Sequence, residues 1–309
     1  MIANVFNKTR PLNYLLISIL LIVFFFLKAI ISISSNSSTY NIFEVFGIFA
    51  VVFASVFLTN FIALKNELTK NNNFTLLLFF IFLLFFPSFF HNINIVISNF
   101  LLLLALRRLI SLKSLKFTKE KIFDASFWIF LSALFHFWSI FYIVLVFITI
   151  ILYVSTDYRN WIIPFIALFA VTILFFLANS ILANNFLNNL LSKTYISFDF
   201  YYFDTIYQRI VLALFSSLSL FFFVNQVFDI PNKALNLQSS HKTILFSFLL
   251  GVGIYIISAN KNNGSLAFCF TPLAIIGANF IEKIESNLGK ELVLYFLFAS
   301  GILFYFLQL

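Results

Sequence analysis

Long apolar runs separated by short polar breaks dominate the chain. A helix rises about 1.5 Å per residue and the hydrocarbon core of a bilayer is about 30 Å thick, so roughly 17–25 apolar residues predict a membrane-crossing helix. The pattern predicts an all-α polytopic membrane protein with a single transmembrane domain over residues 1–309. The pattern predicts eleven spans, several of which are short for a full crossing. The eleven spans are Leu12–Ile33, Phe43–Leu64, Phe74–Phe90, Ile93–Leu106, Ile122–Phe137, Trp138–Tyr153, Trp161–Leu182, Ile210–Val224, Thr243–Ile257, Ser265–Ile281 and Leu292–Leu307.

One apolar stretch, Ile122–Tyr153, has two interpretations. Its 32 residues are too many for one upright helix and few for two full crossings. His136 and Trp138 lie at its centre, and both side chains favour a membrane interface over the middle of a bilayer. We therefore predict two short helices hinged at this point. The alternative is one long helix whose tilt absorbs the extra length.

The distribution of Lys and Arg predicts the orientation. With the N-terminus inside and the spans alternating, the inner segments hold 15 of the 19 basic residues. Basic residues concentrate on the cytoplasmic side of membrane proteins. The chain is therefore predicted to lie N-terminus in and C-terminus out, and its net charge of +8 needs no nucleic-acid partner.

The composition supports this class and excludes others. The chain is 62% hydrophobic and 10% charged, whereas soluble domains carry about a quarter charged residues. A single cysteine, Cys269, excludes an internal disulfide framework and a cysteine-based metal cluster. The sequence has no phosphate-binding glycine loop, no dinucleotide fingerprint and only three histidines, so it predicts no cofactor and no metal.

Rare polar side chains gather on the predicted outer side. Carboxylates, histidines and aromatic rings on one face suit acid–base chemistry on a sugar or a phosphate-linked lipid. An ordinary aromatic belt, interfacial histidines and helix caps are the plainer explanation of each residue taken singly. We predict that Glu44, His136 and Asp204 converge on one cavity, because ionisable groups are costly in a membrane unless they are used or hydrated. The candidate substrate-binding residues are His91, Asp199, Tyr202, Asp204 and Arg209.

The inner segment Arg107–Lys121 holds six basic residues interleaved with apolar ones. This pattern is typical of an amphipathic stretch on an anionic leaflet. Anchoring by the positive-inside rule is the plainer interpretation, and a phosphate or pyrophosphate site is the alternative. Asp124, at the start of the next span, is predicted to cap that helix.

Four segments resemble an uncharacterised family of bacterial envelope membrane proteins. They are Thr9–Asn13, Asp124–Phe127 running into Leu131–His136, Arg159–Pro164 and Pro272–Asn279. The resemblance covers the whole chain and implies a fold and a location rather than a mechanism.

A looser resemblance concerns Ser132–Phe137, which is similar to the helix–His–helix hairpin of polytopic glycosyltransferases and polysaccharide polymerases that use lipid-linked sugars. The catalytic acid of those enzymes usually lies in the first outer loop, and the acid near that loop here is Glu44. The resemblance implies Glu44 and His136 as catalytic candidates.

Together these observations lead to one functional expectation and two alternatives. We expect a multi-pass protein of the bacterial cytoplasmic membrane that handles lipid-linked saccharide at an outer-facing site, in the manner of a glycosyltransferase or polymerase. Its expected partners are membrane lipids and other membrane proteins. The first alternative is a non-enzymatic subunit of a complex for secretion, motility or envelope assembly. A transporter is third, because no internal repeat is visible.

Overall fold

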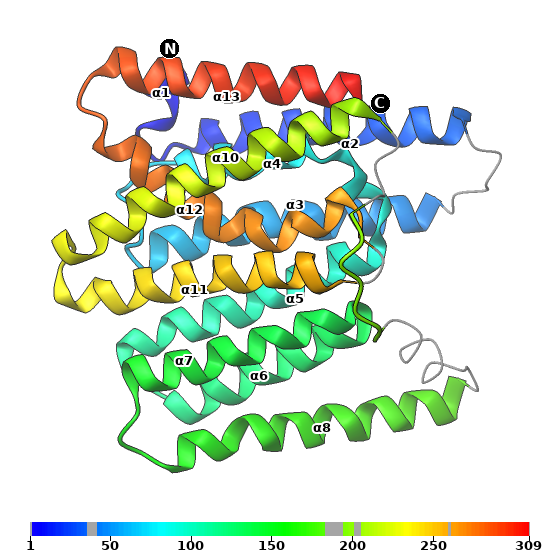
Figure 1. Ribbon diagram of the computed structural model, residues 1–309, viewed down its shortest axis with the longest axis vertical. Helices are drawn as coiled ribbons and strands as arrows, with labels where there is room; N and C mark the ends of the chain where they lie inside the picture. The colour runs from blue at the N-terminus through cyan, green and yellow to red at the C-terminus, as the bar shows by residue number, and fades with distance from the viewer. Residues whose placement is uncertain (1, 36–41, 183–193, 201–204, 259–260, 309) are drawn as a thin grey trace.

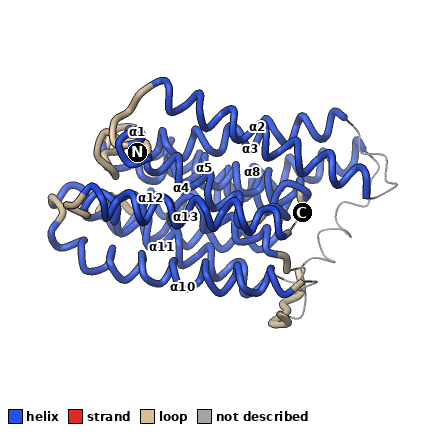
Figure 2. Tube along the Cα trace, turned by 90° about the horizontal axis from the view of Figure 1, so that it is seen from above, coloured by secondary structure: helices blue, strands red, loops and turns tan. Residues whose placement is uncertain are grey.

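The structure is a computed structural model that describes residues 2–35, 42–182, 194–200, 205–258 and 261–308, without the side chains of 32–35, 42 and 91. Within these ranges every regular element is helical and no strand occurs (Figure 2). The α-helices are α1 (Ile2–Phe6), α2 (Pro11–Ser35), α3 (Ile42–Lys65), α4 (Phe74–Phe85), α5 (Ile93–Ile110), α6 (Thr118–Phe135), α7 (Ile143–Tyr153), α8 (Arg159–Leu182), α10 (Ile206–Asp229), α11 (Leu235–Ile257), α12 (Ala267–Lys283) and α13 (Asn287–Leu307). Short 3-10 helices are η1 (Pro87–His91), η2 (Ser111–Ser114), η3 (Phe137–Tyr142), η4 (Ile230–Asn232) and η5 (Asn263–Leu266).

The long helices run back and forth, so their connections gather at two ends of the bundle (Figure 1). We call these the N-terminal end, where α2 begins, and the C-terminal end, where α13 finishes. At the N-terminal end the backbone N–H of Asn73 donates to the carbonyl of Phe6 at 2.9 Å. At the C-terminal end the amide Nε2 of Gln308 donates to the carbonyl of Phe85 at 3.1 Å. Segments far apart in the sequence therefore close both ends.

Two helices, α4 and α12, form the centre of the bundle. Every residue of α4 is buried, and α12 lies against α4, α10 and α11. Phenylalanine rings fill the space between them, and the Phe270 ring lies 6.1 Å from Phe79 and 5.8 Å from Phe86. Lipid is as apolar as these side chains, so close packing between helices supplies the stabilisation rather than exclusion of water.

An ion-paired cluster joins α10 to α12 at the N-terminal end. The buried Asp229 carboxylate lies 3.2 Å from the Lys233 ammonium and 2.5 Å from that of Lys283. Nearby, Glu282 accepts hydrogen bonds from the Asn72 side chain at 2.6 Å and from the Lys70 backbone N–H at 2.9 Å. These contacts provide partners for carboxylates that would be costly to bury alone.

Eight helical segments of the described chain are long and apolar enough to cross a membrane, as a polytopic membrane protein requires. Each of the eleven predicted spans contains a helix, but Phe74–Phe85 and Phe137–Tyr153 are short, and α6 begins with charged residues. Eleven crossings and the N-in orientation stay predictions. The eight segments are Pro11–Ile31, Phe43–Lys65, Ile93–Ser114, Arg159–Ile181, Ile206–Asn232, Leu235–Ile257, Asn263–Lys283 and Asn287–Leu307.

Candidate functional site

The predicted hinge within Ile122–Tyr153 is present at the C-terminal end. Helix α6 ends at Phe135, His136 adopts an extended conformation, and the chain returns through η3 and α7. The two-helix interpretation is therefore confirmed over the single long helix. The extended backbone at His136 ends the helical hydrogen-bond pattern of α6. The His136 side chain therefore contacts other elements of the bundle.

A serine cluster holds this hinge together. The Ser132 hydroxyl of α6 lies 2.7 Å from that of Ser98 in α5 and donates to that of Ser139 in η3 at 2.9 Å. All three residues are buried. Hydroxyl groups in an apolar interior need partners, and these three serines supply one another.

The His136 ring connects the hinge to the end of α11. Its Nε2 atom lies 2.9 Å from the hydroxyl of Ser258, the residue that caps α11, and its ring packs on Phe268 with centroids 5.2 Å apart. The half-buried ring therefore has a fixed orientation. An imidazole ring can donate or accept a hydrogen bond, so this position suits hydrogen bonding to a polar ligand.

A lysine lies beside this pair. Lys261 is only 7% exposed, and its ammonium donates to the carbonyl of Ser258 at 3.0 Å and to the carbonyl of Ser197. The same ammonium lies 4.9 Å from the centre of the Phe200 ring. Burial lowers the pKa of Lys261, and the carboxylate of Asp199 opposes that shift. The cation therefore lies within a framework of carbonyl oxygens and an aromatic face.

An apolar groove of about 290 Å³ opens between α6 and α8. Two of its lining residues are close in sequence to the polar cluster, since Phe137 follows His136 directly and Thr194 lies three residues before Ser197. An apolar groove with this relation to a cation and a histidine suits an amphiphilic ligand with an anionic or polar head. The groove is lined by Phe130, Ala133, Leu134, Phe137, Ile140, Leu168, Val171, Thr172, Phe175 and Thr194.

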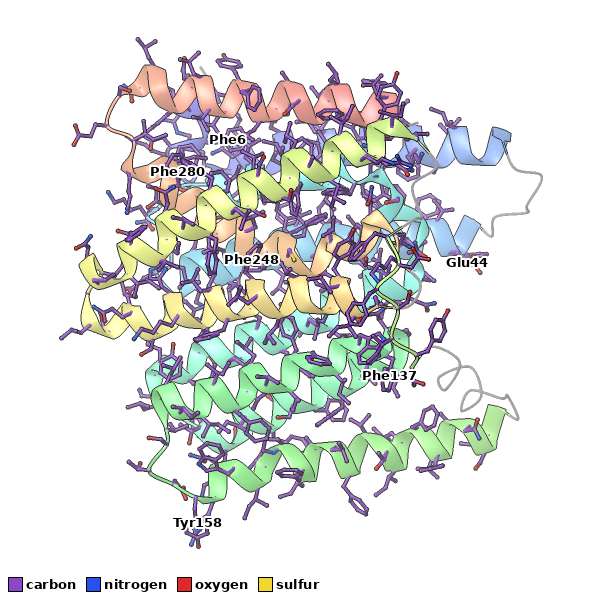
Figure 3. All side chains as sticks on the ribbon, viewed as in Figure 1. Phe6, Glu44, Phe137, Tyr158, Phe248 and Phe280 are labelled. Atoms are coloured by element: carbon purple, nitrogen blue, oxygen red, sulfur yellow. The ribbon has the colours of Figure 1, made fainter. Side chains whose placement is uncertain are left out.

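The structure brings together two of the sequence-predicted residues and separates a third. His136 contacts the hydroxyl of Ser258, and the carbonyl of Ser258 accepts a hydrogen bond from Lys261. The charge of Asp199 acts on the same Lys261 ammonium. Glu44 is exposed in the first turn of α3, and Figure 3 shows it at the tip of that helix, away from Phe137. Arg209 is exposed near the start of α10 and makes contacts of its own. The structure therefore does not place Glu44 beside His136.

Three other predicted residues have no described side chain. Tyr202 and Asp204 lie outside the described residues, so the predicted convergence of Asp204 with Glu44 and His136 stays untested. His91 ends η1, and its side chain also lies outside the description. Within the described part of the chain, no three His, Cys, Asp or Glu side chains form a group able to hold a metal ion.

Sequence reasoning missed Lys261 and Ser258 as site residues. A signal was present, since Lys261 is one of four basic residues that the predicted topology leaves on the outer side. A cation on the side where the positive-inside rule predicts few has a reason to be there. Its proximity to Ser197 is a property of the packed bundle that no local pattern reveals.

The helices and their hinge define a polytopic, all-α membrane protein. The chain belongs to a family of unknown function, DUF6427, whose model matches residues 8–309. Comparison with curated proteins and with solved structures found no match. The family confirms the expected kinship with an uncharacterised group and leaves activity to be argued from the site.

Proposed function

We propose that this protein binds a lipid-linked saccharide at its C-terminal end, on the outer face of a bacterial cytoplasmic membrane. The observation that carries the proposal is the apolar groove between α6 and α8, whose lining residue Phe137 directly follows His136 of the cluster with Ser258 and Lys261. The groove takes the hydrocarbon chain, and the cluster takes the polar head.

The chemistry of the cluster supports a head that carries phosphate and sugar. An ammonium with a desolvated stem attracts a phosphate linkage, and charge-assisted hydrogen bonds are the strong ones. The Phe200 ring lies 4.9 Å from the cation, and Tyr195 of the same segment is exposed. Such faces suit stacking against sugar rings. The similarity of the His136 hairpin to that of polytopic glycosyltransferases agrees with this ligand class.

The position of Glu44 bears on whether the bound lipid also reacts. Acid–base catalysis requires the base within hydrogen-bond reach of the proton that it removes. Glu44 lies apart from His136, which favours binding without catalysis at this pair. A non-enzymatic subunit of a membrane complex is therefore the second candidate function. Under that reading Glu44→Gln is tolerated, whereas the enzymatic reading makes it inactive at normal protein levels.

Photocrosslinking tests the lipid site. Protein carrying a benzophenone amino acid at Leu168, which lines the groove, is reconstituted in phosphatidylethanolamine–phosphatidylglycerol vesicles containing a trace of radiolabelled polyprenyl-diphosphate saccharide. The matched control is Leu174 on the same helix, which is 49% exposed against 40% for Leu168 and does not line the groove. We expect the labelled lipid to be enriched over its share of the membrane at Leu168 and not at Leu174.

The head-group contact has its own variant in the same assay. Lys261→Met should reduce the enrichment at Leu168 about tenfold, the cost of losing a hydrogen bond to a charged group, while Lys261→Arg preserves it. Equal lipid capture at Leu168 and Leu174, or enrichment unchanged in Lys261→Met, would contradict the proposed site.

A further inference from the structure

A second pocket, separate from the groove, lies at the N-terminal end of the bundle. It has a volume of about 450 Å³, within the range of about 300–1,000 Å³ typical of ligand sites. Three elements form its wall: the end of α3 with the turn after it, the end of α5 with η2, and the start of α6. The lining residues are Lys65, Asn66, Glu67, Arg107, Arg108, Ser111, Lys113, Ser114 and Lys121.

Positive charge dominates this pocket. Five of its lining side chains are basic and one, Glu67, is acidic. Two of the cations already have carboxylate partners, since Lys113 lies 3.0 Å from Glu67 and Arg108 lies 3.0 Å from Asp124. The prediction that Asp124 caps α6 is wrong, because the helix begins at Thr118 and Asp124 lies inside it, where it pairs with Arg108 instead.

Three cations of the pocket have no carboxylate within salt-bridge distance among the described residues: Lys65, Arg107 and Lys121. Lys65 and Arg107 both lie against one ring, that of Phe61, at 5.0 Å and 5.1 Å from its centre. Both cations line the pocket, so an anion bound there meets two positive charges.

The third cation, Lys121, is held by the short helix η2. Its ammonium donates to the carbonyl of Ser111 and to the hydroxyl of Ser114, both at 2.7 Å. Burial and then the neighbouring Arg108 lower the pKa of Lys121, so the surroundings disfavour its charge as they stand. An anion in the pocket would favour the charged form again.

The backbone around the pocket is strained. The described residues contain three non-glycine positions with positive φ: Glu67 at 57°, Leu115 at 54° and Phe117 at 51°. Glu67 lines the pocket, and the other two lie in the short loop between η2 and α6. Left-handed backbone is unfavourable for side chains other than glycine, and strain of this kind gathers at ligand clamps. Plain anchoring to a membrane surface requires neither the hollow nor the strained loops.

We propose that this pocket binds a phosphorylated ligand through a phosphate or diphosphate group, with Arg107 and Lys65 as its main contacts and Lys121 as a third. Guanidinium and ammonium groups converging from three elements match the several oxygens of a phosphate better than one carboxylate. Two sources share this chemistry. One is a soluble phosphate compound, and the other is the head group of an anionic lipid, toward which the exposed Leu115 and Phe117 beside the pocket would turn.

Two probes separate these sources. Inorganic pyrophosphate is titrated calorimetrically into the protein in neutral detergent, and phosphatidic acid is offered against phosphatidylcholine in native mass spectrometry. Binding of pyrophosphate supports the site with a soluble ligand. Selective retention of phosphatidic acid supports it with a lipid. Failure of both probes overturns the proposal.

Matched variants locate the binding. Arg107→Gln should weaken the bound probe about tenfold or more, because a hydrogen bond to a charged group is lost. Lys116→Gln removes the same charge from the nearby loop between η2 and α6, outside the pocket, and it should change affinity about twofold or less. Equal losses in the two variants would show a diffuse surface field and overturn the pocket.

A gain-of-affinity variant protects the test against misfolding. Glu67→Gln removes the lining carboxylate and releases Lys113 from its ion pair. It should bind the probe more tightly than the wild type, which a damaged fold would not produce. Unchanged or weaker binding in Glu67→Gln contradicts a phosphate site in this pocket.

Discussion

Two glycines of α11 differ in what surrounds them. A methyl group at Gly251 would lie 2.8 Å from the carbonyl oxygen of Phe268 and 3.0 Å from the sulfur of Cys269. At Gly253 nothing lies within 4 Å. The lack of a side chain at Gly251 thus permits the close approach of α11 to α12, whereas Gly253 has no part in that contact. Their spacing in the sequence contains no hint of this difference, because it depends on which side of α11 faces its neighbour.

Gly251→Ala should destabilise the protein by about 1–3 kcal/mol, since backbone atoms of α12 would have to move. Gly253→Ala should be neutral or stabilising by up to about 1 kcal/mol, because alanine favours a helix more than glycine does. Thermal unfolding of the two purified variants in the same detergent measures the difference. Equal shifts in the two unfolding temperatures would contradict the close contact at Gly251.

At the scale of elements, the hinge between α6 and η3 depends on a few hydroxyl groups. Ser132→Ala removes the hydroxyl that serves both Ser98 and Ser139, and it should cost about 1–3 kcal/mol because buried groups lose their partner. Ser126→Ala, on the same helix, removes a hydroxyl that among the described residues bonds only to the Ile122 carbonyl one turn before, so its cost should be smaller. Chemical denaturation in mild detergent compares the two; a larger loss in Ser126→Ala would argue against the serine cluster.

Apolar runs predicted where helices lie but not where they end. The predicted span Thr243–Ile257 stops at polar residues, yet α11 begins at Leu235. Its first turns are accommodated because Ser240 bonds to Tyr153 at 2.9 Å and His241 lies 3.2 Å from Gln226. A hydropathy pattern treats such residues as solvent-facing. Their burial depends on partners supplied by other helices, which the sequence does not identify.

At the scale of the molecule, the connections at the N-terminal end carry most of the charge. Lys113 pairs with Glu67 between the α3 and α5 turns, and Lys119 lies 3.7 Å from Asp157.

The predicted site was partly accessible from sequence, since the His136 hinge followed from local chemistry. The Lys261 contacts were not, because Ser197 and Lys261 are 64 residues apart and meet only after the bundle packs.

The positive-inside distribution predicts that this charged end faces the cytoplasm. In a Cys269→Ser background, a cysteine at Ser114 should react with a membrane-impermeant thiol reagent only after the membrane is permeabilised. A cysteine at Ile196, at the opposite end and 55% exposed, should react in intact cells. Labelling of Ser114→Cys from outside would reverse the orientation and place the groove on the cytoplasmic face.

The central position of α4 has a consequence for biosynthesis. Its neighbours include α12 and α13, which the ribosome begins about 190 and about 210 residues later. At roughly 5–20 residues per second, α4 waits roughly 10–40 s for the helices that will enclose it. During that interval its phenylalanine-rich surface faces lipid or the insertion machinery, and a chain that stops before α12 leaves that surface uncovered. Nascent chains truncated there are expected to be substrates for membrane quality control.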